Sequence, residues 1–117
     1  MAFFSTGPIE NNPVNGVRIT QQLTIKIENR DSLNGGTVRI QGYVLDGTMT
    51  LYVLELFSIN PSQVITKNYF ADLDAFKFEL TTGGTAADQI EISVWGKSAS
   101  GEINSTHRLV SEELLEP

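Results

Sequence analysis

The stretch that most limits the folds open to this chain is residues 17–30, VRITQQLTIKIENR. Successive side chains of a strand point to opposite faces of a sheet, so the alternation of apolar and polar residues here predicts a strand with one buried and one solvated face. Such a strand is typical of an antiparallel sheet that packs on a core with one face. The residues expected on the buried face are Val17, Ile19, Leu23, Ile25 and Ile27.

Further segments of the chain also have the composition of strands. Turn-forming residues separate them at intervals of about ten residues, and no amphipathic helix lies between them. This pattern predicts an all-β fold, a single antiparallel β-sandwich over residues 17–117. Strand order is not visible in the spacing, so a jelly roll and an immunoglobulin-like Greek key both stay open. The expected strands are 37–46, with a bulge at Gly42, and 48–57, 63–70, 75–80, 89–97 and 103–110.

The segment Thr48–Phe57, TMTLYVLELF, is apolar at both even and odd positions. A helix is the competing prediction because Leu, Met and Glu are good helix formers, but the threonines, the aromatics and the lack of an N-cap box favour a strand. A sandwich strand normally buries one face and exposes the other. A strand that is apolar on both faces therefore predicts that a neighbouring subunit covers the second face.

Residues 1–16, MAFFSTGPIENNPVNG, read as an extended N-terminal arm, because proline, glycine and asparagine disfavour a helix there. No partner for this arm is evident elsewhere in the sequence. Two interpretations stay open: a disordered tail, or an assembly connector that docks on a neighbour's open sheet edge. The adjacent aromatics Phe3 and Phe4 favour docking, because exposed they would promote aggregation.

Composition excludes several classes of partner. The chain has 117 residues and no cysteine, so it forms neither disulfides nor thiolate metal sites. Its formal charge is −6 and its basic residues are scattered singly, whereas nucleic acids and anionic membranes select clustered Lys and Arg. The first basic residue is Arg18, and no continuous apolar run precedes it. We therefore expect synthesis in the cytoplasm without a signal peptide, and no nucleic-acid or membrane partner.

Candidate catalytic residues are few. His107 is the only histidine, so a histidine-based zinc site lacks a second ligand in one chain. Ser105 and Ser111 lie near it in sequence, but no nucleophile-elbow pattern surrounds either. The loop 81–88, TTGGTAAD, contains no lysine for a phosphate-binding loop. The sequence thus predicts no enzyme, with no catalytic residue.

Three weaker patterns point to ligands. Asp72 and Asp74 on one turn could hold calcium, although an ordinary acidic turn fits better. Residues 104–106, NST, match a glycosylation sequon, a frequent chance match. Trp95, Tyr43 and Tyr52 could form an aromatic platform for a sugar, but scattered aromatics more often pack in a core. We therefore expect no metal and no cofactor.

A family resemblance adds to this interpretation. Residues 92–97, ISVWGK, then 106–109, THRL, then 112–114, EEL, together with the opening MAFFSTGPI, resemble a group of small cysteine-free proteins of spore-forming Bacillus relatives. These are endospore appendage subunits of the thin-fibre type that has no disulfides.

The resemblance implies a jelly-roll-like subunit that stacks head to tail into a noncovalent fibre on the spore surface, at the exosporium. The N-terminal segment would dock on the next subunit, with Phe3, Phe4, Pro8 and Ile9 as the assembly interface. The main partner is the chain itself; anchor proteins, collagen-like tip proteins and trimeric layers are further suggestions of the resemblance. The alternative is a monomeric β-sandwich module that binds a carbohydrate or protein ligand.

Overall fold

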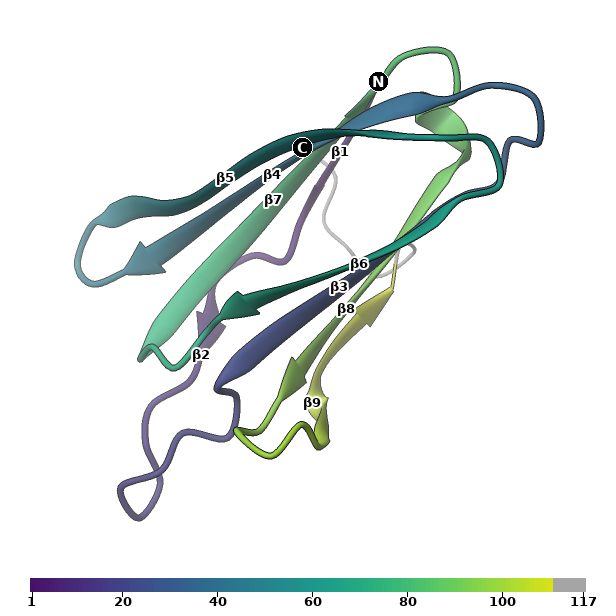
Figure 1. The fold of residues 1–117 in the computed structure, drawn as a ribbon. Helices are drawn as coiled ribbons and strands as arrows, with labels where there is room; N and C mark the ends of the chain where they lie inside the picture. Colours follow the sequence, from purple (N-terminus) through teal and green to yellow (C-terminus); the bar gives the residue numbers. More distant parts are fainter. Residues whose placement is uncertain (111–117) are drawn as a thin grey trace.

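A computed structural model describes residues 1–110 as two antiparallel sheets packed against each other (Figure 1), which confirms the predicted β-sandwich. Within these residues the one helical element is the short 3-10 turn η1 (Ala87–Gln89). The tail from Ser111 onward lies outside the described residues.

The two sheets interleave in sequence, so most connections cross from one sheet to the other. Neighbouring strands are consecutive only in the β4–β5 and β8–β9 hairpins. The first sheet has the order β1 (Ala2–Ser5), β7 (Ala75–Gly83), β4 (Gly36–Leu45) and β5 (Met49–Ile59), and β2 (Ile9–Glu10) also pairs with β7. The second has the order β6 (Val64–Phe70), β3 (Gln22–Asn29), β8 (Ile90–Lys97) and β9 (Ile103–Val110).

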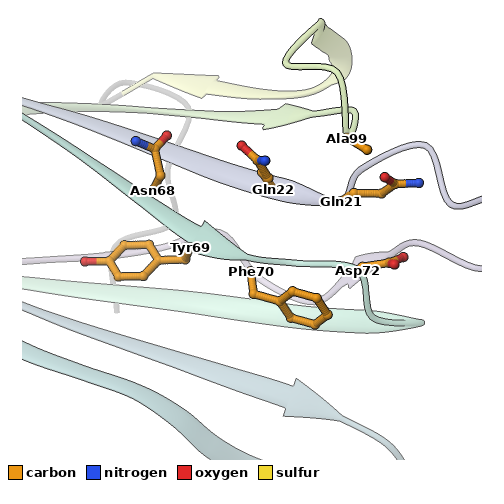
Figure 2. A pocket seen from close by; sticks show the side chains of 7 residues that line it. All are labelled: Gln21, Gln22, Asn68, Tyr69, Phe70, Asp72 and Ala99. Carbon is orange, nitrogen blue, oxygen red and sulfur yellow. The ribbon is translucent and has the colours of Figure 1, made fainter.

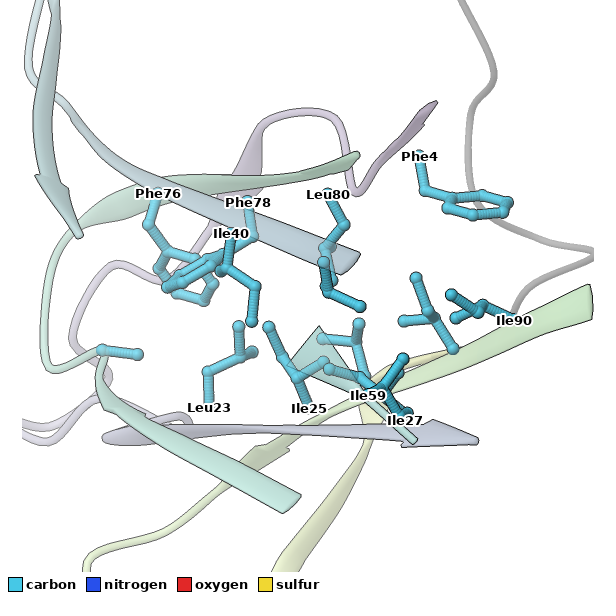
Figure 3. Close-up of a cluster of buried hydrophobic side chains, with 14 residues drawn as sticks. Phe4, Leu23, Ile25, Ile27, Ile40, Ile59, Phe76, Phe78, Leu80 and Ile90 are labelled. Atoms are coloured by element: carbon cyan, nitrogen blue, oxygen red, sulfur yellow. The ribbon is translucent and has the colours of Figure 1, made fainter. Parts of the chain in front are cut away.

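The core lies between the sheets and is built from alternate residues of the central strands (Figure 3). Alternation places one parity of each strand inward, so the apolar residues of both sheets meet there. The patterns at 75–80 and 89–97 are confirmed. The main buried residues are Leu23, Ile25, Ile27, Val38, Ile40, Phe76, Phe78, Leu80, Ile90, Ile92 and Val94.

The first predicted strand begins later than expected. Val17 is 59% exposed and Ile19 is 50% exposed, and β3 starts at Gln22. Val17 instead pairs back on Val14 across a tight turn, in which Asn15 and Gly16 have φ of 53° and 80°. The prediction that these two residues are buried is therefore wrong, because a local turn ends the alternation before it reaches the sheet.

The bulge expected at Gly42 is present. The register between β4 and β5 shifts between Gly42 and Tyr43. A Cβ atom at residue 42 would lie 2.8 Å from the ring of Phe78. A side chain is excluded here because the Phe78 ring packs directly on the backbone of β4.

The N-terminal arm is extended, as predicted, but it has a partner within its own chain. β1 and β2 both pair antiparallel with β7, where Phe4 lies opposite Leu80 and Ile9 opposite Phe76. Between them, the N–H of Thr6 donates to the carbonyl of Phe78 at 3.0 Å. The segment that sequence analysis left without a partner thus forms one edge of the first sheet.

Candidate functional site

A row of exposed apolar side chains follows β5. Leu51, Leu54 and Leu56 are 44%, 60% and 72% exposed. They point away from the core, because their partners on β4 also lie on the outer face, whereas Phe57 packs against the core. Among the described strands β5 pairs only with β4, so its second backbone edge is open.

This surface bears on the expectation that β5 is covered on both faces. One face is covered by the chain's own core, through Tyr52, Val53 and Phe57. The other face is open to solvent in the single chain. Its coverage by a neighbouring subunit stays a prediction.

The one charged residue of β5 is engaged on the inner side of the sandwich. Glu55 accepts a hydrogen bond from the Tyr69 hydroxyl at 2.7 Å and forms an ion pair with Lys67 at 3.3 Å. The Tyr69 bond lowers the pKa of Glu55, while burial and then this bond raise the pKa of Tyr69. The outer face of β5 therefore carries no charge, and leucines predominate on it.

The four residues predicted as an assembly interface do not lie together. Phe4 is 6% exposed and belongs to the core, and Ile9 packs against that core. Pro8 is exposed, and Phe3 is half-buried. Because Phe4 points inward, its neighbour Phe3 points to the outer face of the first sheet, opposite Thr81 of β7. Two of the four residues thus hold the arm in its own sheet, and two face outward.

A pocket of about 470 Å³ lies at the end of β6 (Figure 2). It was not predicted, because its residues come from the start of β3, the end of β6, and the β6–β7 and β8–β9 turns. Three side-chain amides, one carboxylate and one exposed aromatic ring dominate it. The lining residues are Gln21, Gln22, Asn68, Tyr69, Phe70, Asp72 and Ala99.

Of the candidate catalytic residues, His107 is the one whose side chain the structure describes. His107 Nδ1 lies 2.7 Å from the hydroxyl of Thr20. Burial lowers the pKa of His107, and a hydrogen bond to the backbone of Glu10 opposes this in part. Ser111 lies outside the described residues, as do the side chains of Ser105 and the rest of the sequon.

The two aspartates of the turn after β6 form ion pairs with the side chain of Arg18. Arg18 contacts Asp72 at 3.2 Å and Asp74 at 2.6 Å. Over residues 1–110 no group of three or more His, Cys, Asp or Glu is placed to hold a metal ion. Nor does this part of the chain contain a helix long and apolar enough to cross a membrane.

The three aromatics considered as a sugar platform lie on different surfaces. Tyr52 packs edge-on against Phe78, with ring centroids 6.0 Å apart. The ring of Tyr43 lies under Lys77, 5.4 Å from its Nζ. Trp95 lies opposite Thr24 in the second sheet. Strand order places these residues apart, so they form no common platform, and packing, which the sequence favoured, describes Tyr52.

Comparison with known proteins gives the fold alone. No family model matches, and no curated protein matches. The crystal structure of Thermotoga maritima 1070 is similar, with a TM-score of 0.55 and 9% identity over 98% of this chain and 90% of that chain. The Anabaena sensory rhodopsin transducer gives a TM-score of 0.45 at 14% identity, over 78% of this chain and 90% of that chain.

Proposed function

We propose that this chain is a non-catalytic structural subunit that joins copies of itself edge to edge into a noncovalent fibre. The observation that carries the proposal is the open, apolar and uncharged edge at β5, with its outward leucines. Natural sandwiches usually protect a long edge strand with charges or prolines, because an unprotected edge recruits another chain. β5 runs from Met49 to Ile59 and has neither on its outer face, and its protection is limited to the inward-pointing Glu55 and the bulge opposite Gly42.

The opposite edge of the same sheet supplies a partner surface. β1 is the other edge strand, and it runs antiparallel to β5 because an even number of antiparallel strands separates the two edges. Copies stacked in the same orientation therefore place β1 of one beside β5 of the next in the antiparallel direction. Such a joint uses two different surfaces, and head-to-tail joints of this kind generate open chains.

Side chains on the outer face suit this joint. Phe3 points to the same face as Leu56, because both lie in one row across the sheet. Pairing would place Phe3 of one copy near Leu54 and Leu56 of the next. Burial of a leucine or phenylalanine contributes about 1.5 to 3 kcal/mol for each fully buried side chain. Pro8 lacks an N–H, so backbone pairing would be limited to β1 itself.

This arrangement keeps the arm as an assembly surface but changes its role. Phe4 and Ile9 anchor the arm in its own sandwich, and Phe3 and Pro8 face the next subunit. With no cysteine in the chain, the joint is noncovalent. The resemblance to thin endospore appendages supports a spore-surface fibre as the setting for this assembly, with cytoplasmic synthesis in the mother cell.

Negative-stain microscopy and sedimentation of purified protein test the proposal. We expect filaments from the unmodified chain and a single 12.9 kDa species from the double variant Leu54→Lys, Leu56→Lys. The control is Leu33→Lys, at a position that is 84% exposed in the loop after β3, which should still form filaments. Circular dichroism should show equal folding in all three proteins. A chain that stays monomeric at every concentration would refute the proposal and favour the monomeric module.

A further inference from the structure

We propose a second site: the pocket at the end of β6 binds a neutral oligosaccharide. It lies on the edge strand β6 of the second sheet, where Tyr69 and Phe70 contact Glu55 and Tyr52 of β5, but none of its lining residues belongs to β1 or β5. Its volume of about 470 Å³ falls within the range of about 300 to 1,000 Å³ that small-ligand sites occupy.

Side-chain amides supply the hydrogen-bonding groups. Gln22 and Asn68 point to the same side of the second sheet from β3 and β6 (Figure 2). Asn68 Oδ1 accepts a hydrogen bond from the Thr24 hydroxyl at 2.6 Å, which fixes the amide. Its NH₂ group keeps donor capacity for a ligand, and Gln22 offers both a donor and an acceptor. Sugar hydroxyls, which donate and accept, match such amides.

The apolar wall comes from Phe70, the last residue of β6. Its side chain is 61% exposed, and in Figure 2 its ring lies on the other side of β6 from the amides of Gln22 and Asn68. The hydroxyl of Tyr52 donates to the backbone carbonyl of Phe70, so the backbone that carries the ring is held in place. An exposed ring beside polar groups is an apolar contact surface for the C–H faces of a sugar.

Charge favours a neutral ligand. Asp72 is the only ionisable carboxylate of the lining, and it shares Arg18, at 3.2 Å, with Asp74, which lies closer to Arg18 at 2.6 Å. No Lys or Arg is among the lining residues, although Lys97 lies opposite Gln22 on β8, and the carboxylate of Asp72 repels anionic ligands such as phosphates or acidic sugars. A chain of neutral hexose or N-acetylhexosamine units fits the amides, the ring and the lack of a lining cation.

Titration of the assembly-deficient Leu54→Lys, Leu56→Lys protein, followed by amide NMR shifts, tests this site. If the unmodified chain is also monomeric, it can be titrated in place of the variant. The probes are maltohexaose, cellohexaose and chitohexaose, with an acidic oligogalacturonate as the charged comparison. We expect at least one neutral probe to saturate shifts at Gln21, Gln22, Asn68 and Phe70, and the acidic probe to cause none.

Two substitutions at the site and one matched control complete the test. Phe70→Ala and Asn68→Ala should each weaken binding at least ten-fold. Val64→Ala, at the other exposed end of β6 and 53% exposed, should leave affinity unchanged. Absence of saturable shifts with all three neutral probes would overturn the proposal, as would binding that survives both site variants. If a neutral probe binds but the unmodified chain forms no filaments, the sugar site is supported and the assembly proposal is refuted.

Discussion

Asn11 and Thr20 hydrogen-bond to each other twice. Nδ2 of Asn11 donates to the backbone carbonyl of Thr20 at 2.7 Å, and the backbone N–H of Thr20 donates to Oδ1 of Asn11 at 3.1 Å. The same Nδ2 lies 3.1 Å from the carbonyl of Ala71 and 3.0 Å from that of Leu73. One buried amide, 4% exposed, therefore ties the end of the arm to the segment before β3 and to the β6–β7 turn.

Replacement of Asn11 by alanine should destabilise the fold strongly. Buried carbonyls would lose their donor, and each unsatisfied buried group costs about 1 to 3 kcal/mol. We expect the free energy of unfolding, measured by urea denaturation, to fall by about 3 kcal/mol. The control is Asn12→Ala, because Asn12 is exposed and bonds only to the Glu10 carboxylate among described groups. Equal losses of unfolding free energy in the two variants would contradict a stabilising role for the hydrogen bonds of Asn11.

The two adjacent phenylalanines of the arm should behave differently. Phe4→Ala empties a core position and should cost about 3 to 5 kcal/mol of unfolding free energy. Phe3→Ala removes a half-buried side chain on the outer face and should cost about 1 kcal/mol or less. Chemical denaturation of dilute, monomeric protein provides the comparison. Similar losses would show that β1 does not occupy its own sheet in solution.

Much of the fold could be predicted from the sequence, because alternation is a local property. Phe76, Phe78 and Leu80 are buried as their spacing requires. Val17 and Ile19 continue the same pattern and yet are exposed. The difference lies in the turn at Asn15 and Gly16, whose positive φ values lead the chain away from the sheet. Periodicity reports which face a strand would bury, but it does not report where pairing begins.

The candidate sites depend on contacts between distant residues and were harder to predict. The partner of Phe4 is Leu80, and nothing local to either residue indicates that pairing. The pocket combines Gln22 with Phe70, which meet because β3 and β6 pair antiparallel. A signal was present at Phe70, an aromatic residue at the last position of a predicted strand. Its amide neighbours became apparent only once the strand order was known.

Gly42 should tolerate no side chain. In Gly42→Ala the new Cβ would lie 2.8 Å from the Phe78 ring and 3.0 Å from Cβ of Val53, so the core must shift. Overpacking of this kind typically costs about 1 to 3 kcal/mol. Thermal melts should show a lower midpoint than the neighbouring variant Gln41→Ala, whose side chain points to the outer face. An unchanged midpoint would mean that the Phe78 ring can move aside without loss.

Acid should destabilise the protein through His107. Burial lowers the pKa of its imidazole below the usual 6.5, so between the folded and unfolded pKa values the unfolded chain binds more protons. Stability from the neutral ring is therefore complete above pH 6.5 and falls as the pH drops through that window. Glu55, whose pKa is lowered from 4.5, contributes a loss only at more acidic pH. Urea denaturation from pH 8 to pH 4 should show that the free energy of unfolding of the unmodified chain falls as the pH drops below 6.5. In His107→Gln it should stay constant just below pH 6.5, because glutamine does not titrate. A decline that persists in His107→Gln between about pH 6.5 and 5 would assign the titration to another group.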